Sequence, residues 1–234
     1  MVTQAGSLVS VVVPVYNGEQ YLAEALDSVL SQTERNLEIL VVDDGSNDSS
    51  AAIIAEYTDR DERVRMLTQP NSGVTAARNA GILASRSQYI AFIDQDDRWR
   101  HDALATHLHT LYSKPDLGYT LAHQVCFLQP GATAPDWFQL QKLDEAVAGY
   151  LPGALCTRRS VFDTIGLFDE RYSVSSDADW FAKARDANVT MELLSQVILE
   201  RRIHSVNQSR HAEFIQKELL QLLHESIRRK REQL

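Results

Sequence analysis

Short apolar runs alternate with stretches of helical periodicity along the first 113 residues, and this alternation constrains the fold more than any other feature. Leu8–Val15 is rich in β-branched residues, as expected of a strand that is buried on both faces. Pro14 is expected to end this strand, since proline cannot donate to a central ladder. Glu19–Ser31 then carries apolar residues at the three- and four-residue spacing of an amphipathic helix. Three more pairs follow, with strands expected at Leu37–Val42, Val64–Thr68 and Tyr89–Ile93 and helices at Ser49–Thr58, Thr75–Ala84 and His101–Tyr112. Such a repeat predicts an α/β fold with a mostly parallel sheet and helices on both faces.

The pattern becomes less regular after residue 113. Prolines and glycines in Gln129–Gly149 indicate a long irregular segment, and Gly166 is expected to end a short helix. The other elements expected in this half are strands at Gly118–Leu128, Leu151–Thr157 and Val189–Glu200, and helices at Arg159–Ile165, Asp177–Ala187 and Ala212–Ile227. No internal repeat or linker separates the halves, so we expect one domain over residues 1–234, with halves at 1–113 and 114–234.

Charge and cysteine content narrow the function classes. The chain has 23 Lys and Arg residues against 32 Asp and Glu residues, a net charge of −9, which disfavours nucleic-acid binding. Cys126 and Cys156 are too few for a disulfide framework or a zinc site, so we expect two buried free thiols in a reducing compartment. No apolar run approaches the roughly 18 residues of a membrane span, and no signal peptide is visible. We therefore expect a cytoplasmic protein.

Several motifs of phosphate and hydrolytic chemistry are missing from the sequence. It contains no G-x-G-x-x-G after the first strand and no G-x-x-x-x-G-K-[ST], which disfavours dinucleotide-binding and P-loop proteins. It also lacks a G-x-S-x-G nucleophile elbow, an H-E-x-x-H motif and a C-x-x-C motif.

Acidic residues gather where a ligand site of a parallel sheet belongs. Asp94, Asp96 and Asp97 directly follow the fourth strand, and Asp43 and Asp44 follow the second. Ligands of such sheets bind beyond the carboxyl ends of the strands. Closely spaced carboxylates repel one another unless a cation is present, and Mg²⁺ or Mn²⁺ takes oxygen ligands readily. The alternative is a solvated acidic loop that caps the next helix.

Four segments in this order closely resemble the family 2 glycosyltransferases, which have a glycosyltransferase A-type fold. They are VSVVVPVYNGEQYLAEALDSVLSQT (9–33), LEILVVDDGSNDSS (37–50), NSGVTAARNAGI (71–82) and YIAFIDQDD (89–97). The second half is similar to the family more loosely, through PGALCTRRSVFDTIGLFDERY, SSDADWFAKA and RRIHSVNQS. The resemblance implies an inverting transfer of a sugar from a nucleotide-diphosphate sugar, with residues 1–113 binding the nucleotide and residues 114–234 the acceptor.

The resemblance also assigns roles to individual residues. A carboxylate at Asp43 or Asp44 would suit a uracil or thymine imide N–H, which points to a UDP sugar. The expected donor-binding residues are Pro14, Tyr16, Glu19, Asp43, Asp44, Gly73, Arg78, Asp94 and Asp96. Asp96 and His204 are expected to hold Mn²⁺ or Mg²⁺, which would stabilise the leaving diphosphate.

Asp177 is the expected general base, which would take a proton from the acceptor. The family usually has Glu-Asp at this point, whereas this chain has Ser176-Asp177, and that departure puts the acceptor contacts in doubt. Asp179 is a rival for the role, and Asp177 serving only as a helix cap is the structural alternative. Trp137, Tyr150 and Trp180 are each expected in the core, with stacking on acceptor sugars as the alternative.

The partners implied are a nucleotide-sugar donor and an acceptor that the sequence does not identify. A growing glycan, a lipid-linked sugar, a peptide and a small metabolite are all open. The basic residues 228–231 complement the dipole of the last helix, and peripheral docking to an anionic membrane is the alternative.

Two other functions compete with glycosyl transfer. A sugar nucleotidylyltransferase would need a basic residue in the loop after the first strand, where residues 16–20 carry none. A nucleotide- or carbohydrate-binding module without catalytic activity would bind the donor and transfer nothing.

Overall fold

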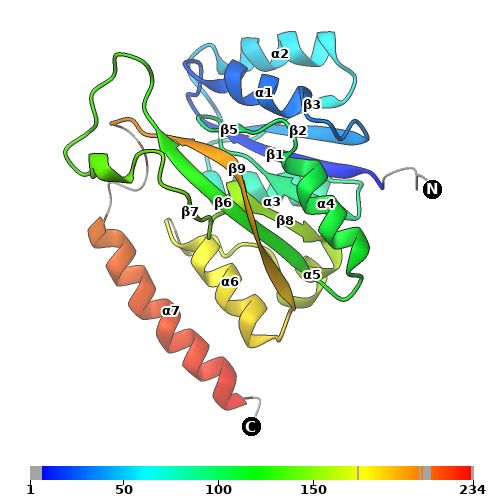
Figure 1. Ribbon diagram of the computed structural model, residues 1–234, viewed down its shortest axis with the longest axis vertical. Coiled ribbons are helices and arrows are strands. Elements are labelled where there is room, and N and C mark those ends of the chain that lie inside the picture. Colours follow the sequence, from blue (N-terminus) through cyan, green and yellow to red (C-terminus); the bar gives the residue numbers. More distant parts are fainter. Residues whose placement is uncertain (1–6, 173, 206, 208–211, 233–234) are drawn as a thin grey trace.

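The computed structural model describes residues 7–172, 174–205, 207 and 212–232. Its described strands form one nine-stranded sheet, to which both halves of the chain contribute (Figure 1). The strand order is β3-β2-β1-β4-β8-β6-β9-β5, and β7 pairs with β6 outside this path.

The first half has the expected parallel arrangement. Strand β1 (Val9–Val15) lies between β2 (Leu37–Asp43) and β4 (Tyr89–Phe92), and β3 (Val64–Thr68) extends the sheet beyond β2. All residues of β1, β2 and β4 are buried, which explains their continuous apolar character. The connecting helices are α1 (Leu22–Leu30), α2 (Ser50–Arg60), α3 (Val74–Ala84) and α4 (Ala103–Ser113).

The second half adds strands of both directions. β8 (Leu155–Arg158) runs antiparallel to β4, and β6 (Tyr119–Phe127) runs antiparallel to β8 and parallel to β9 (Met191–Arg202). The remaining elements are β5 (Arg98–Trp99), β7 (Val147–Ala148), α5 (Arg159–Ile165), α6 (Ser176–Asp186), α7 (Ala212–Glu232) and the 3₁₀ turns Leu140–Lys142 and Pro152–Ala154. The sheet is thus parallel where the strand–helix repeat predicts it and mixed beyond.

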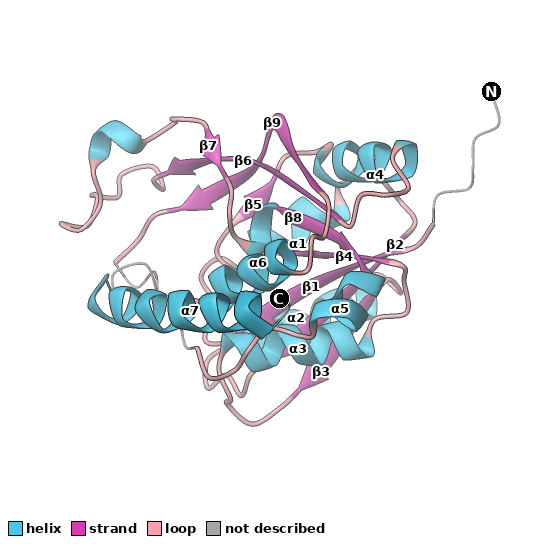
Figure 2. Ribbon diagram, turned by 90° about the horizontal axis from the view of Figure 1, so that it is seen from below, coloured by secondary structure: helices cyan, strands magenta, loops and turns pink. Residues whose placement is uncertain are grey.

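A hydrophobic core lies on each face of the sheet. Leu26 of α1, Ile54 of α2 and Leu104 of α4 pack in one core. Ala77 of α3 and Trp180 of α6 pack in the other. Figure 2 shows α4 on one side of the sheet and α3 and α5 on the other. Helices therefore cover both faces, as the sequence predicts.

Several details differ from the sequence-based expectations. Pro14 does not end β1 but lies within it, opposite Val42. It is tolerated there because the pairing of β1 with β4 stops at Val12, so the proline lies beyond the part of β1 that has strands on both sides. The two-residue strand β5 has too short an apolar signal to be predicted. Both cysteines are free, but only Cys156 is fully buried and Cys126 is partly exposed.

The last helix is attached to the body by polar contacts with α6. Figure 1 shows α7 beside α6. The Glu218 carboxylate of α7 accepts the backbone N–H of Ser175, at 2.8 Å, just before α6 begins. Near the other end, Ser226 and Arg229 donate to the Asp186 carboxylate. No helix in the described part of the chain is long and apolar enough to span a membrane.

Candidate functional site

The carboxyl ends of β1, β2 and β4 meet at one edge of the sheet, since these strands are parallel. The loops that leave this edge hold the expected donor-binding residues. Pro14 and Asp43 are buried at the ends of β1 and β2, and the Asp43 carboxylate accepts the backbone N–H of Ser46 at 3.0 Å. Asp43 therefore holds the loop after β2.

Asp44 organises the loop that precedes α3. Its carboxylate accepts hydrogen bonds from the Gln69 side chain (2.7 Å) and from the backbone N–H groups of Ser72 and Gly73 (both 2.8 Å). Gly73 has φ +91°, and a Cβ there would meet no atom within 4 Å. Its glycine is thus required by the backbone conformation, while the space beside it is open to a ligand.

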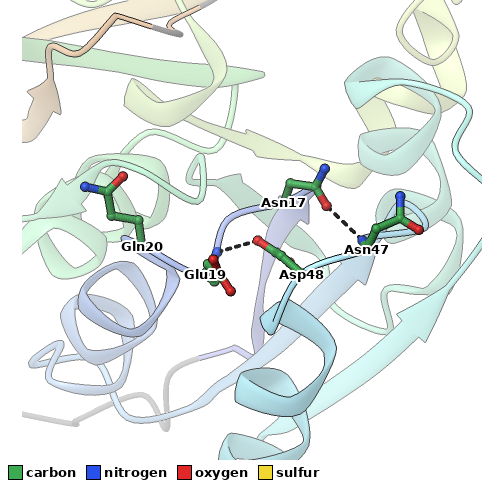
Figure 3. A pocket seen from close by; sticks show the side chains of 5 residues that line it. All are labelled: Asn17, Glu19, Gln20, Asn47 and Asp48. Carbon is green, nitrogen blue, oxygen red and sulfur yellow. Dashed lines mark hydrogen bonds between the residues drawn. The ribbon is translucent and has the colours of Figure 1, made fainter.

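Hydrogen bonds join the loops after β1 and β2 beside a pocket of about 360 Å³ (Figure 3). The backbone N–H of Asn47 donates to the Asn17 side chain (2.8 Å), and that of Glu19 donates to Asp48 (3.1 Å). The Glu19 carboxylate in turn accepts the backbone N–H of Ser49. Glu19 therefore shapes these loops in the structure.

Arg78, Asp94 and Asp177 form one electrostatic cluster. Arg78 of α3 is buried and donates to the Asp94 carboxylate at 2.6 Å. Its Nε is buried without a hydrogen-bond partner among the described residues. Partial burial raises the pKa of Asp177, Arg78 lowers it in part, and the charge of Asp94 raises it further. Asp177 is thus kept more basic than an ordinary aspartate, as a general base requires.

The structure brings Asp96 and His204 into direct contact. His204 Nε2 lies 2.8 Å from Asp96 Oδ2, and both side chains are partly exposed. Asn207 Nδ2 reaches the same two atoms, at 3.3 Å from Asp96 and 3.1 Å from His204. Sequence reasoning missed Asn207, although it lies in the RRIHSVNQS segment.

The side chains of Asp96 and His204 fit a divalent cation that is bound together with a diphosphate. They offer a carboxylate oxygen and an imidazole nitrogen that lie 2.8 Å apart on partly exposed side chains, and both are common ligands of Mn²⁺. Among the described residues, no group of three or more His, Cys, Asp or Glu side chains converges to form a complete cage. The remaining ligands would therefore come from the substrate and water, the usual arrangement for Mg²⁺ at phosphates.

Arg202 is a buried arginine that helps to hold Asp96 in its contact with His204. Arg202 is only 1 % exposed. Its side-chain Nε donates to the backbone oxygen of Asp96 (2.8 Å), and its backbone N–H donates to the Asp97 carboxylate (2.9 Å). Its guanidinium lies between the rings of Tyr21 and Phe127, at 4.5 and 4.6 Å. Burial, together with the charges of Asp96 and Asp94, raises the pKa of Asp97. Asp97 is therefore a supporting residue.

Ser176, at the start of α6, stands where the family usually has a glutamate, and the structure shows what this serine contacts. Ser176 is buried, and its hydroxyl accepts a hydrogen bond from Thr75 of α3 at 3.0 Å. The serine thus joins α6 to α3, and Asp177 is held beside Arg78. Asp179 is buried and faces away, to Lys183 (2.6 Å) and Arg229 (3.8 Å). Of the two candidate bases, only Asp177 belongs to the cluster around Arg78.

The aromatic and basic residues of the second half have different environments. Trp180 is fully buried against Phe162 and Phe168, as expected of a core residue. The expectation of a core position is wrong for Tyr150, which is 59 % exposed, and Trp137 is only partly buried and packs on Phe138. In the basic segment that ends α7, Arg229 is engaged with Asp186 and Asp179 and is therefore part of the attachment of the helix.

Comparison with known sequences gives the family. The model of glycosyl transferase family 2 matches residues 10–166. Glycosyltransferase GlyA of Streptococcus pneumoniae is 43 % identical over 106 residues, which cover 45 % of this chain and 15 % of the relative. An uncharacterized glycosyltransferase of Rickettsia typhi is 31 % identical over 213 residues, 84 % of this chain and 64 % of the relative. This chain thus spans less than two thirds of the length of either relative.

Solved structures share the fold. A mannosyltransferase from Pyrobaculum calidifontis, in complex with GDP-Man and Mn²⁺, has a TM-score of 0.74 at 18 % identity, covering 96 % of this chain and 65 % of its own. TarS residues 1–349 of Staphylococcus aureus, in complex with UDP-GlcNAc, has a TM-score of 0.70 at 21 % identity, covering 87 % and 60 %. These likenesses confirm the expected fold class, and the family match covers most of the sheet and the loops that carry the expected donor-binding residues. The chain belongs to glycosyl transferase family 2.

Proposed function

We propose that this chain transfers a sugar from a nucleotide-diphosphate sugar, with a UDP sugar as the preferred donor, to an acceptor hydroxyl with inversion at the anomeric carbon. The observation that carries the proposal is the approach of His204 Nε2 to within 2.8 Å of Asp96 Oδ2 at the edge where the parallel strands end. A carboxylate and an imidazole in this position are the ligands expected of a cation that accompanies a diphosphate.

The nucleoside would bind at the ends of β1 and β2. Tyr16 is 44 % exposed there, and Asp44 and Gly73 form the adjoining wall. Asp44 accepts one hydrogen bond on Oδ2, which leaves that oxygen able to accept a second one from a pyrimidine imide. The likeness to UDP-bound TarS supports a UDP donor, whereas the likeness to the GDP-Man complex supports a guanine nucleotide. A carboxylate acceptor suits the imide N–H of uracil, and the titration below compares uracil, thymine and guanine nucleotides directly.

The transfer balances as a single displacement. Asp177 takes the proton of the acceptor hydroxyl as its oxygen bonds to the anomeric carbon, and the bond from that carbon to the diphosphate oxygen breaks with its electron pair. The Arg78 guanidinium, which pairs with Asp94, would place positive charge near the negative charge of the donor. Bound Mn²⁺ or Mg²⁺ supplies positive charge to the leaving diphosphate. Expulsion of one nucleoside diphosphate distinguishes this reaction from nucleotidyl transfer, which releases pyrophosphate.

Calorimetric titration with UDP, GDP and dTDP, each with and without Mn²⁺ or Mg²⁺, tests the proposal. We expect UDP to bind, and to bind tighter with the metal. Release of UDP from a series of UDP sugars, with water in place of the acceptor, would then identify the sugar. Failure of the folded protein to bind any of the three diphosphates would overturn the donor assignment. Donor binding without hydrolysis or transfer to any of many acceptors would favour a binding module.

A further inference from the structure

Strands β1 and β4 are paired only as far as Val12 and Phe92. Beyond this point β1 continues beside β2 to Val15, whereas β4 ends and its chain enters a loop. One side chain joins the two loops again. Gln95 Oε1 accepts the backbone N–H of Tyr16 at 2.8 Å, and Gln95 Nε2 donates to the backbone oxygen of Tyr16 at 3.0 Å. The amide of Gln95 thus occupies both backbone groups of one residue, as a neighbouring strand would.

The Gln95 amide lies so close to Gly18 that position 18 has no room for a side chain. A Cβ on Gly18 would lie 2.4 Å from Gln95 Oε1 and 2.6 Å from its Cδ. Gly18 does not have a positive φ, so its backbone conformation alone does not call for glycine. Glycine is favoured at position 18 because the Gln95 side chain approaches it so closely. Gln95 and Gly18 are therefore a matched pair, one from each loop.

The two loops carry different parts of the donor site. The loop after β4 contains Asp94, which holds Arg78, and Asp96, which meets His204. The loop after β1 carries the exposed ring of Tyr16. Because both backbone groups of Tyr16 are fixed by Gln95, the position of its ring depends on the loop that holds Asp96. Nucleoside and diphosphate sites must keep a fixed separation, since one ligand occupies both.

We propose that Gln95 is a positioning residue that sets the distance between the nucleoside-binding and cation-binding loops, acting through the backbone of Tyr16 and the close fit to Gly18. The inference rests on the proposed function, because it assigns these loops to one nucleotide-sugar donor. A site whose loops are already held in the bound geometry does not lose affinity to the ordering of those loops. Loss of the two hydrogen bonds is therefore expected to weaken donor binding more than turnover.

The test is the Kd of UDP with Mn²⁺, measured by calorimetry on Gln95→Ala, Gly18→Ala and the double variant. We expect Gln95→Ala to raise the Kd about tenfold. Gly18→Ala is expected to do the same, because the new methyl group displaces a flexible side chain. The double variant is expected to bind no more weakly than Gln95→Ala alone, since the methyl group then has nothing to displace. In UDP-sugar hydrolysis, the KM for the donor should rise more than kcat falls.

Gln32→Ala is the matched control for a merely structural amide. Gln32 makes three side-chain hydrogen bonds, to Ser28, Arg100 and Leu104, at the far end of α1. Its removal is expected to lower the unfolding temperature and leave the Kd of UDP within about twofold of the wild-type value.

An unchanged Kd in Gln95→Ala, or fully additive losses in the double variant, would overturn the inference. Wild-type protein that binds no nucleoside diphosphate would instead overturn the proposed function on which it rests, so the two failures are distinguishable.

Discussion

His204 Nε2 lies 2.8 Å from Asp96 Oδ2, although 108 positions separate the two residues in the chain. Ligand atoms that share one octahedral Mg²⁺ or Mn²⁺ lie about 3 Å apart, since each is about 2.1 Å from the ion. The pair therefore already has the spacing of two adjacent ligands. β9 delivers the histidine to this point by running parallel to β6 as far as Arg202, two residues before it.

Removal of either proposed metal ligand, Asp96 or His204, is expected to abolish the metal dependence of donor binding. Asp96→Asn and His204→Ala should each raise the Kd of UDP in the presence of Mn²⁺ by about tenfold or more, and bring it close to the metal-free value. His224→Ala is the control, because His224 is exposed on α7. Wild-type metal dependence in both ligand variants would contradict this assignment.

Asp177→Asn is expected to lower catalytic activity, whereas Asp179→Asn is expected to lower stability. Asn at position 177 cannot accept the acceptor proton, so kcat should fall about 10²- to 10⁴-fold while the Kd of UDP changes little. Asn at position 179 removes the buried charge that pairs with Lys183 at 2.6 Å and lies 3.8 Å from Arg229, so the unfolding temperature should fall. Rate assays at saturating donor and thermal melts separate the two effects. A larger loss of kcat in Asp179→Asn would assign the base to Asp179.

The raised pKa of Asp177 predicts both a pH profile and a stability effect. Activity should decline as the pH falls through a pKa above that of an ordinary aspartate, because the base must be ionised. Burial and Asp94 raise this pKa and Arg78 lowers it, so Arg78→Gln should move the acidic limb to higher pH. A pKa raised on folding means that stability falls as the pH rises past the unfolded value of about 3.9. Asp177→Asn should therefore melt at a higher temperature than the wild type at pH 7.

The sequence predicts the first half of this fold well because two regular signals agree there. Buried parallel strands give continuous apolar runs, and the loops at their carboxyl ends are where Asp44 and Asp94–Asp97 lie. Position relative to the strands was therefore enough to identify the acidic residues. Contacts such as Asp96 with His204 required the family resemblance, because no local pattern relates residues 108 positions apart.

Supporting residues were beyond reach of the sequence for a different reason. Gln95, Arg202 and Asn207 have ordinary polar side chains, and their roles depend on which backbone groups the fold leaves beside them. Gln95 finds both backbone groups of Tyr16 only because β1 and β4 diverge. Ser176 likewise turns toward Thr75, a contact that neither segment signals. The sequence shows the departure from the family at this position, and the structure shows what the serine contacts.

Arg202→Lys is expected to destabilise the protein despite keeping the charge. The guanidinium donates to Glu24 (2.6 Å), to Gln129 and to the backbone oxygen of Asp96, and it stacks between two rings. A lysine ammonium has neither the planar fork nor the stacking face. The free energy of unfolding should fall by about 2–4 kcal/mol in urea titrations, with a weaker affinity for Mn²⁺–UDP. Lys at this position with wild-type stability would show that charge alone suffices.

Attachment of α7 is expected to depend on the Asp186 carboxylate. It is buried, and it accepts hydrogen bonds from Ser226 (2.8 Å) and Arg229 (3.0 Å). Burial alone would raise the pKa of Asp186, but these donors and nearby arginine charges hold it below the ordinary value. A lowered pKa contributes stability above the unfolded value of about 3.9, and that contribution is lost as the pH falls through the folded pKa. Asp186→Asn should therefore cost about 1–3 kcal/mol at pH 7 and progressively less below about pH 4.

Arg229→Ala should reproduce the loss at pH 7, because it removes the cation that faces Asp186 and Asp179. Arg231→Ala is the matched control, since Arg231 is an exposed arginine on the same helix. Urea titration of the three variants at pH 7 and pH 3.5 measures the difference. Equal losses for Arg229→Ala and Arg231→Ala would mean that α7 is held by its general charge and dipole. A loss confined to Arg229→Ala would mean that the buried contact to α6 holds the helix on the body.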